Sequence, residues 1–335
     1  MTPSPKPIPK RPLWKPLVVA AAAVAAAAAG LWQLSRPHGE LRLAIVNWPA
    51  YEYLYLAEDQ ALARPFGLDL RVAQYSSLLD QRQAFERGDV QAIATTLPEA
   101  LAICHERPAR CPQLILVLDQ SDGADRILAR APIATPQQLL GKRVGLERAV
   151  LAMYLLTRSL GDQPRALTKE MQLRFDVPEG LVARLRAGEL DAIVTYHPYD
   201  TSLRKDPAIR EVFSSKRIPG EIVDVLAVDP TYARDHRQEL KALVQTWWAA
   251  REYARRNPSQ AAAVMAQRQQ LDLEDFQASE RGLLYPSQAD QRDLLAPEGP
   301  INRTLGRVAA LMRSSGDIAP ATPLPVLNRQ FLGGP

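Results

Sequence analysis

Two segments one hundred residues apart repeat the same pattern, and this repeat constrains the fold more than any other feature of the sequence. Residues 87–98 read RGDVQAIATTLP, and residues 187–198 read AGELDAIVTYHP. In each copy an amphipathic helix ends at a glycine, which suits the left-handed residue that follows a helix. An acidic residue and a short apolar strand come next, and then a proline that is expected to start another helix. We infer that one structural unit is used once in each of two lobes.

Short apolar strands alternate with amphipathic helices on both sides of this repeat. The predicted strands are 41–46, 68–74, 90–95, 114–118, 143–146, 171–177, 190–195 and 222–228. The predicted helices are 52–63, 78–87, 150–160, 179–186, 237–256, 259–267, 273–283 and 301–313, with others opening at Pro98 and Pro136. Such alternation predicts parallel sheets joined by right-handed crossovers. We predict that residues 40–125 and 223–335 form lobe 1 and that residues 126–222 form lobe 2.

The first 36 residues are a separate segment with the composition of an export signal. Four basic residues and no acidic residue precede an apolar run, 17–34, which is 18 residues long. As a helix this run spans about 27 Å, just enough to cross a bilayer, with Trp14 and Trp32 at its ends. The basic residues keep the N-terminus cytoplasmic, so everything after Arg36 is predicted to be exported. Residues 27–29 are alanines of the kind signal peptidase accepts, and both a cleaved signal peptide and an uncleaved anchor remain open.

The charge of the remaining chain argues against a nucleic-acid partner. The full sequence has 41 basic and 37 acidic residues, so removing the four basic residues that precede the apolar run leaves 37 of each. The high isoelectric point therefore reflects targeting. The exported part, residues 37–335, is long enough to divide into two lobes around a large core.

The two cysteines, Cys104 and Cys111, are separated by six residues. In an oxidising compartment we expect them to form a disulfide, which on the chain-entropy model contributes about 2–3 kcal/mol. The alternative is a pair of buried thiols. Without histidines at a suitable spacing the two cysteines do not make a zinc site, and the four histidines show no metal spacing, so no metal is predicted.

Catalytic and cofactor motifs are missing from the sequence. There is no glycine-rich dinucleotide turn and no phosphate loop, and Ser121 lacks the glycine two positions earlier that a nucleophile elbow requires. Together with export and two lobes, this pattern favours binding over catalysis. No cofactor and no catalytic residue are predicted.

Polar and aromatic residues follow several of the predicted strands. In open α/β sheets ligands bind at the carboxyl ends of strands, and pockets favour the seam between lobes. The residues that this rule selects are Trp48, Tyr51, Glu52, Thr95, Thr96, Ser121, Asp122, Asp125, Glu147, Thr195, Tyr196, His197 and Asp224. Structural alternatives exist, because Trp48 could cap the core, Glu52 could complement the dipole of its helix, and His197 could be a satisfied structural histidine.

Several short motifs match one family of binding proteins. They are Trp48-Pro49-Ala50-Tyr51-Glu52, Gly88-Asp89-Val90, Ser121-Asp122-Gly123-Ala124-Asp125, LGKRVG at 140–145, GELDA at 188–192, Trp247-Trp248 and Asn257-Pro258. With these motifs, the stretch from about residue 41 to 331 resembles the ABC-transporter substrate-binding proteins of the nitrate/sulfonate/taurine and thiamine-pyrimidine-precursor group. The resemblance implies the type II periplasmic-binding-protein, or Venus-flytrap, fold: two α/β lobes, two crossing strands, and a ligand in the cleft. It also implies a periplasmic location and an ABC permease of the inner membrane as partner.

The sequence departs from this family in ways that bear on the ligand. Sulfonate and nitrate binders often carry small hydroxyl residues or glycine after the lobe 2 strand, where helix-end N–H groups hold an anion. Here that position reads Leu-Glu-Arg at 146–148, and Glu147 repels an anion unless it is protonated or paired with Arg148. The cysteine-rich iron motif of the related pyrimidine-forming enzymes is also missing, which argues against that catalytic relative.

These departures favour a ligand that donates hydrogen bonds. The acids Glu52, Asp125 and Asp224 suit amine or heteroaromatic N–H groups, and Trp48 and Tyr196 suit stacking on a flat or cationic ligand. The leading interpretation is an extracytoplasmic protein that captures a small polar organic nutrient, amine-like or pyrimidine-like, for an ABC importer. The alternatives are a membrane-tethered ligand sensor and a binder of sulfonate, nitrate or taurine.

Overall fold

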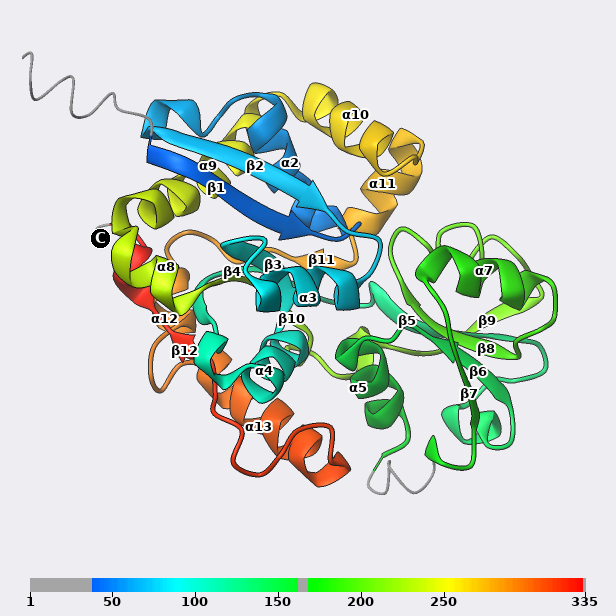
Figure 1. Ribbon diagram of the computed structural model, residues 1–335. Coiled ribbons are helices and arrows are strands. Elements are labelled where there is room, and N and C mark those ends of the chain that lie inside the picture. The colour runs from blue at the N-terminus through cyan, green and yellow to red at the C-terminus, as the bar shows by residue number, and fades with distance from the viewer. Residues whose placement is uncertain (1–37, 162–167, 334–335) are drawn as a thin grey trace, which may run out of the picture.

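The protein consists of two α/β lobes that lie side by side in the computed structural model, which describes residues 38–161 and 168–333 (Figure 1). The sheet of lobe 1 has the strand order β11-β4-β10-β3-β1-β2, with β12 beside β4. The sheet of lobe 2 has the order β7-β6-β8-β5-β9. The predicted fold class is confirmed. The predicted signal or anchor helix, 17–34, lies outside the described residues, and no helix within those residues is long and apolar enough to span a bilayer.

The strands of the two sheets come from interleaved parts of the chain. Lobe 1 contains β1 (His38–Ile45), β2 (Leu68–Gln74), β3 (Ala92–Thr96), β4 (Gln113–Ser121), β10 (Val223–Val228), β11 (Leu283–Leu284) and β12 (Val326–Leu327). Lobe 2 contains β5 (Asp125–Arg130), β6 (Arg143–Leu146), β7 (Gln172–Phe175), β8 (Ala192–Tyr196) and β9 (Ile209–Ser214). The chain therefore crosses from lobe 1 to lobe 2 between β4 and β5, and returns between β9 and β10.

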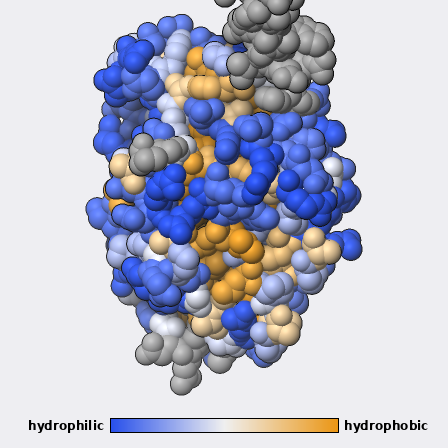
Figure 2. All heavy atoms as spheres, turned by 90° about the vertical axis from the view of Figure 1, so that its left-hand side faces the viewer, coloured by the Kyte–Doolittle hydropathy of each residue, from blue (hydrophilic) through white to orange (hydrophobic). Residues whose placement is uncertain are grey.

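Helices cover the faces of both sheets (Figure 1). Those of lobe 1 are α2 (Glu52–Asp59), α3 (Leu78–Arg87), α4 (Leu97–Glu106), α8 (Pro230–Asp235), α9 (Arg237–Arg256), α10 (Pro258–Arg268), α11 (Leu273–Glu280), α12 (Gln291–Leu294) and α13 (Pro300–Ser315). Those of lobe 2 are α5 (Val150–Ser159) and α7 (Pro178–Arg186). Figure 2 shows the end of lobe 1 that faces away from lobe 2, where a mostly hydrophilic surface surrounds an apolar area.

The repeated segments occupy equivalent places in the two sheets. β3 pairs in parallel with β1 and antiparallel with β10, just as β8 pairs in parallel with β6 and antiparallel with β5. The helices before them, α3 and α7, are followed by Gly88 and Gly188, with left-handed φ angles of 85° and 74°. In this register Thr96 lies opposite Asp224, and Tyr196 lies opposite Asp125. In each lobe, the last residue of the repeated strand therefore lies opposite an aspartate of the neighbouring antiparallel strand.

The second copy of the repeat departs from the prediction at its end. In the first copy the Thr96 hydroxyl accepts the Glu99 N–H at 3.4 Å, and α4 begins with Pro98 in its first turn. In the second copy the His197–Pro198 peptide bond is cis, and residues 197–205 form turns. The expected second helix is therefore wrong, and the turns that replace it place Asp200 in contact with His197 and in an ion pair with Arg126.

The crossing between the lobes is shorter than the sequence indicates. β4 was expected to end at residue 118, but it continues to Ser121, and β5 begins at Asp125. Within this crossing the Ser121 hydroxyl lies 2.8 Å from that of Ser215, which also accepts the Gly123 N–H at 2.7 Å. Cys104 and Cys111 form a disulfide at the end of α4, with their Cα atoms 4.1 Å apart.

Candidate functional site

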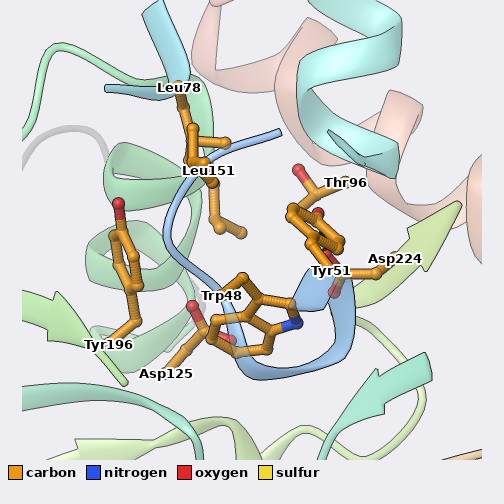
Figure 3. Close-up of a pocket in the computed structure, with 9 residues that line it drawn as sticks. Trp48, Tyr51, Leu78, Thr96, Asp125, Leu151, Tyr196 and Asp224 are labelled. Carbon is orange, nitrogen blue, oxygen red and sulfur yellow. Dashed lines mark hydrogen bonds between the residues drawn. The ribbon is translucent and has the colours of Figure 1, made fainter. Parts of the chain in front are cut away.

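A narrow cavity lies between the two lobes, at the carboxyl ends of their central strands (Figure 3). Its free volume is about 10 Å³, which is about the space of one water molecule. Its lining is drawn from both lobes: Val46, Trp48, Tyr51, Leu78, Thr96, Asp125, Leu151, Tyr196 and Asp224. A second narrow cavity continues into lobe 2 and adds Glu147 and Thr195 to this lining. The strand-end rule applied to the sequence therefore led to residues that lie around one cleft.

Three aspartates gather at the floor of the cleft. Asp119 and Asp224 lie opposite one another on β4 and β10, and Asp125 starts β5 directly after the crossing. Each is at most 3% exposed. The Trp48 indole N–H donates to Asp119 at 3.2 Å, the Tyr51 hydroxyl donates to Asp224, and the Asp125 N–H donates to Ser121.

These acids are buried without an ion pair, although the charge of Arg126 acts to lower the pKa of Asp125, and that of Arg251 the pKa of Asp119. Within residues 38–161 and 168–333 none of the three forms an ion pair. One carboxyl oxygen of each is buried and has no hydrogen-bond partner among the described residues: Oδ1 of Asp119, and Oδ2 of Asp125 and Asp224. An unpaired buried carboxylate is costly, so such oxygens are suited to receive donors from a bound molecule.

Burial dominates the protonation of this cluster. It raises the pKa of Asp125 to about 7, against the Ser121 hydrogen bond, which lowers it. Burial, followed by the charge of Asp119, raises the pKa of Asp224 well above its ordinary value. Burial also raises the pKa of Asp119. A cation in the cleft favours the ionised form of all three, because opposite charge offsets the loss of solvation.

Two aromatic rings from opposite lobes enclose the acids. The rings of Trp48 in lobe 1 and Tyr196 in lobe 2 lie edge to face, with their centroids 6.0 Å apart. Tyr51 lies 6.5 Å from Trp48. Aromatic faces attract cations and flat heterocycles, so these rings complement the acids below them.

Glu147 joins the cleft from lobe 2. It is 4% exposed, and it accepts the Leu78 N–H at 2.6 Å and the Tyr196 hydroxyl at 3.2 Å. Burial raises its pKa to about 8, against the lowering effect of the Leu78 N–H. The sequence leaves two ways in which Glu147 could lie beside an anion without repelling it: protonation, or pairing with Arg148. Instead, the Arg148 guanidinium lies over the Phe175 ring, 4.6 Å from its centroid.

The comparisons with known proteins agree with this architecture. The sequence profile of the NMT1-like family matches residues 35–269, which is more than two thirds of the chain. The chain belongs to the NMT1-like family. A search of the curated proteins gives no match. The resemblance predicted from the sequence motifs is confirmed by this family and by the solved structures that share the fold.

The structural relatives of this NMT1-like protein include periplasmic binding proteins. The alkanesulfonate-binding protein SsuA from Xanthomonas axonopodis pv. citri, bound to MOPS, has a TM-score of 0.68 at 17% identity, over 87% of this chain and 96% of its own. The periplasmic aliphatic sulphonate binding protein SsuA from Escherichia coli has a TM-score of 0.65 at 16% identity, over 88% and 92%. The periplasmic nitrate-binding protein NrtA from Synechocystis PCC 6803 has a TM-score of 0.60 at 10% identity, over 85% and 89%. At such identities the likeness shows the fold.

Five of the residues selected from the sequence of this NMT1-like protein do not line either cavity. Glu52 pairs with Arg268 on the far side of α2, and burial raises its pKa to about 7. His197 contacts Asp200, with the two side-chain atoms 2.5 Å apart. The others are Thr95, Ser121 and Asp122.

The apolar residues of the cleft were not selected from the sequence. Among them, Leu78 and Leu151 line both cavities, and they are in the first turns of helices, where a rule based on polar and aromatic groups does not find them. Asp119, which the strand-end rule places directly after the fourth predicted strand, belongs to that strand and bonds to Trp48. Apolar residues in the first turn of a helix, in both lobes, are the signal that could have found the two leucines.

Proposed function

We propose that this protein is an extracytoplasmic solute-binding protein that captures a small organic cation, amine-like or aminopyrimidine-like, and delivers it to an ABC importer. The fold and the family support a binding protein. The observation that carries the choice of ligand is the group of three buried aspartates, each with one oxygen that has no hydrogen-bond partner and none with an ion pair among the described residues. A ligand that brings positive charge and N–H donors satisfies these oxygens, and Trp48 and Tyr196 stack on it.

An anionic ligand fits this cleft poorly. The relatives named above bind sulfonates or nitrate, but here Asp119, Asp125, Asp224 and Glu147 all lie within the cleft lining or bond directly to it. In their ionised form these acids bring like charges together with a sulfonate in a poorly solvated space, which is strongly unfavourable. We further propose that the protein acts by binding alone and that it carries out no reaction on its ligand.

Calorimetric titration of the exported domain tests this proposal. The ligands are a panel of amines, amidines and aminopyrimidines, together with ethanesulfonate, taurine and nitrate. We expect binding within the cationic group and none with the anions, and we expect Asp224→Asn to weaken it. Asp229→Asn is the matched control, because Asp229 is also a buried aspartate of lobe 1 but caps α8 away from the cleft. Binding of a sulfonate or nitrate, with no response to any cation, would contradict the proposal.

A membrane-tethered sensor with the same cleft is the second candidate, because the apolar run at 17–34 is long enough to remain as an anchor. N-terminal sequencing of the exported protein separates the two. Retention of residues 1–36, together with a ligand-dependent partner other than a permease, favours the sensor. Cleavage after the apolar run favours delivery to an importer.

A further inference from the structure

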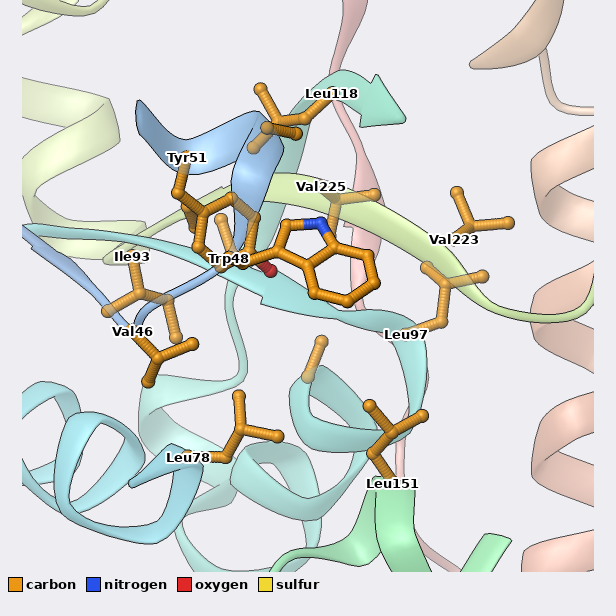
Figure 4. Packing of buried hydrophobic residues seen from close by; sticks show 14 of the residues in the cluster. Val46, Trp48, Tyr51, Leu78, Ile93, Leu97, Leu118, Leu151, Val223 and Val225 are labelled. Atoms are coloured by element: carbon orange, nitrogen blue, oxygen red, sulfur yellow. The ribbon is translucent and has the colours of Figure 1, made fainter. Parts of the chain in front are cut away.

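Two helix N-termini from opposite lobes face the same cleft. α3 of lobe 1 begins at Leu78, and α5 of lobe 2 begins at Val150. Leu78 and Leu151, which belong to these first turns, line both cavities, and Figure 4 shows both side chains below Trp48. The first N–H groups of a helix have no partner within the helix, so each of these ends requires an acceptor.

A glutamate from the other lobe supplies the acceptor at each end. Glu147 of lobe 2 accepts the Leu78 N–H of α3 at 2.6 Å, and Glu99 of lobe 1 accepts the Leu151 N–H of α5 at 3.0 Å. Glu147 is 4% exposed and Glu99 is fully buried. The two bonds therefore cross the cleft in opposite directions and are shielded from water.

Glu99 supplies α5 with a helix cap that the residue before this helix does not provide. α3 has a cap of its own, because the Ser77 hydroxyl accepts the Asp80 N–H at 3.0 Å. α5 follows Ala149, which has no side-chain acceptor, so the cap of this helix comes from the other lobe. Separation of the lobes removes this cap, and it leaves Glu99 with Arg82, its ion-pair partner in lobe 1.

We propose that Glu99 and Glu147 form a two-sided latch, in which a carboxyl group of each lobe caps a helix of the other and holds the lobes closed. The latch consists of protein atoms only, so it holds the lobes closed with no solute in the cleft. This inference goes beyond the proposed function. It also assigns the two glutamates a part in specificity, since helix N-termini are common binding places for anions and an anion must displace a protein carboxyl group to reach either one.

The latch is tested by the distance between the lobes in protein freed of solute. Nitroxide labels on exposed residues of each sheet, at Arg71 in lobe 1 and Arg174 in lobe 2, report this distance by pulsed EPR. We expect Glu99→Ala and Glu147→Ala each to lower the ratio of closed to open molecules by about tenfold, the scale expected for a lost hydrogen bond to a carboxyl group, and the double variant to lower it further.

Two further variants keep the test decisive. Asp229→Ala is the matched control, because its carboxylate accepts two helix N–H groups at 2.9 Å within lobe 1, and we expect it to leave the distance distribution unchanged. Glu147→Gln keeps an acceptor oxygen and is expected to stay closer to the unmodified protein than Glu147→Ala. An unchanged distribution in the double alanine variant, or equal opening by glutamine and alanine at 147, would overturn the latch. Because no solute is added, failure of the proposed ligand class leaves this result intact.

Discussion

Replacing Glu147 with glutamine isolates the free energy associated with one buried carboxyl group. Glutamine keeps the size of the side chain and an oxygen that can accept the Leu78 N–H, but it removes the titrating proton. In the folded protein Glu147 is 4% exposed, and burial raises its pKa to about 8 from an ordinary value of 4.5. The folded protein therefore holds this proton more tightly than the unfolded chain does.

The sign and size of the effect follow from proton linkage. A raised pKa in the folded state means that the contribution of Glu147 to stability is fully present below about pH 4.5 and is lost as the pH rises through about 8. Each pH unit in this window corresponds to about 1.4 kcal/mol, so the loss has an upper bound on the order of 5 kcal/mol. The glutamine variant does not undergo this loss. Its unfolding free energy relative to the unmodified protein should therefore increase between pH 5 and pH 9, by several kcal/mol at most.

Urea unfolding at 25 °C, measured at intervals from pH 5 to pH 9 for both proteins, gives the two curves. Their difference is the informative quantity, because contributions from the other acids cancel to first order. Glu221→Gln is a useful control, since its pKa is lowered by the Arg158 hydrogen bonds despite some burial, and it should not titrate in this window. Parallel curves for the unmodified protein and Glu147→Gln would show that the folded Glu147 ionises like an exposed acid, and the account of the cleft given above would then be wrong.

Four further outcomes are expected. Asp125→Asn and Asp224→Asn should each weaken binding of a cationic ligand by about tenfold or more in calorimetric titration, because each removes a charge from a buried acceptor; full affinity in both would argue against the acid cluster. Affinity of the unmodified protein for the same ligand should increase from pH 5 to pH 8, by up to about tenfold per pH unit for each proton released, because burial raises the pKa of Asp125 to about 7. Trp48→Ala should lose most of the affinity, whereas Trp48→Phe keeps a ring and should retain more; an alanine variant with full affinity would remove Trp48 from the site. Reduction of the bond between Cys104 and Cys111 should lower the unfolding free energy by about 2–3 kcal/mol without changing affinity, as measured by urea unfolding with and without reductant.

The fold could be predicted from the sequence because its decisive signals are local. The glycines that end α3 and α7, and the buried strands that follow, depend on residues within one short segment. β5 and β9 were not predicted. β5 places its apolar residues between charged ends, and β9 exposes Arg210 and Glu211 at the edge of its sheet, so neither has the run of apolar residues that marks a central strand.

The candidate site was predictable where it depends on topology and unpredictable where it depends on distant partners. Thr96 and Tyr196 stand at strand ends, and that alone places them at the cleft. Glu52 also stands near a strand end, but Arg268, 216 residues later, holds it away from both cavities. The sequence around Glu147 shows an acid and gives no indication that its oxygen meets the Leu78 N–H of the other lobe.

Asp125 and Asp224 lie on the two strands by which the chain passes between the lobes, next to the crossings themselves. Rotation of one lobe against the other therefore pivots close to these acids and changes their separation little, while Trp48 and Tyr196, which are carried on opposite lobes, move together or apart. Under the proposed function, a cation held at the acids therefore stays beside the pivot while the two rings close on it from opposite lobes.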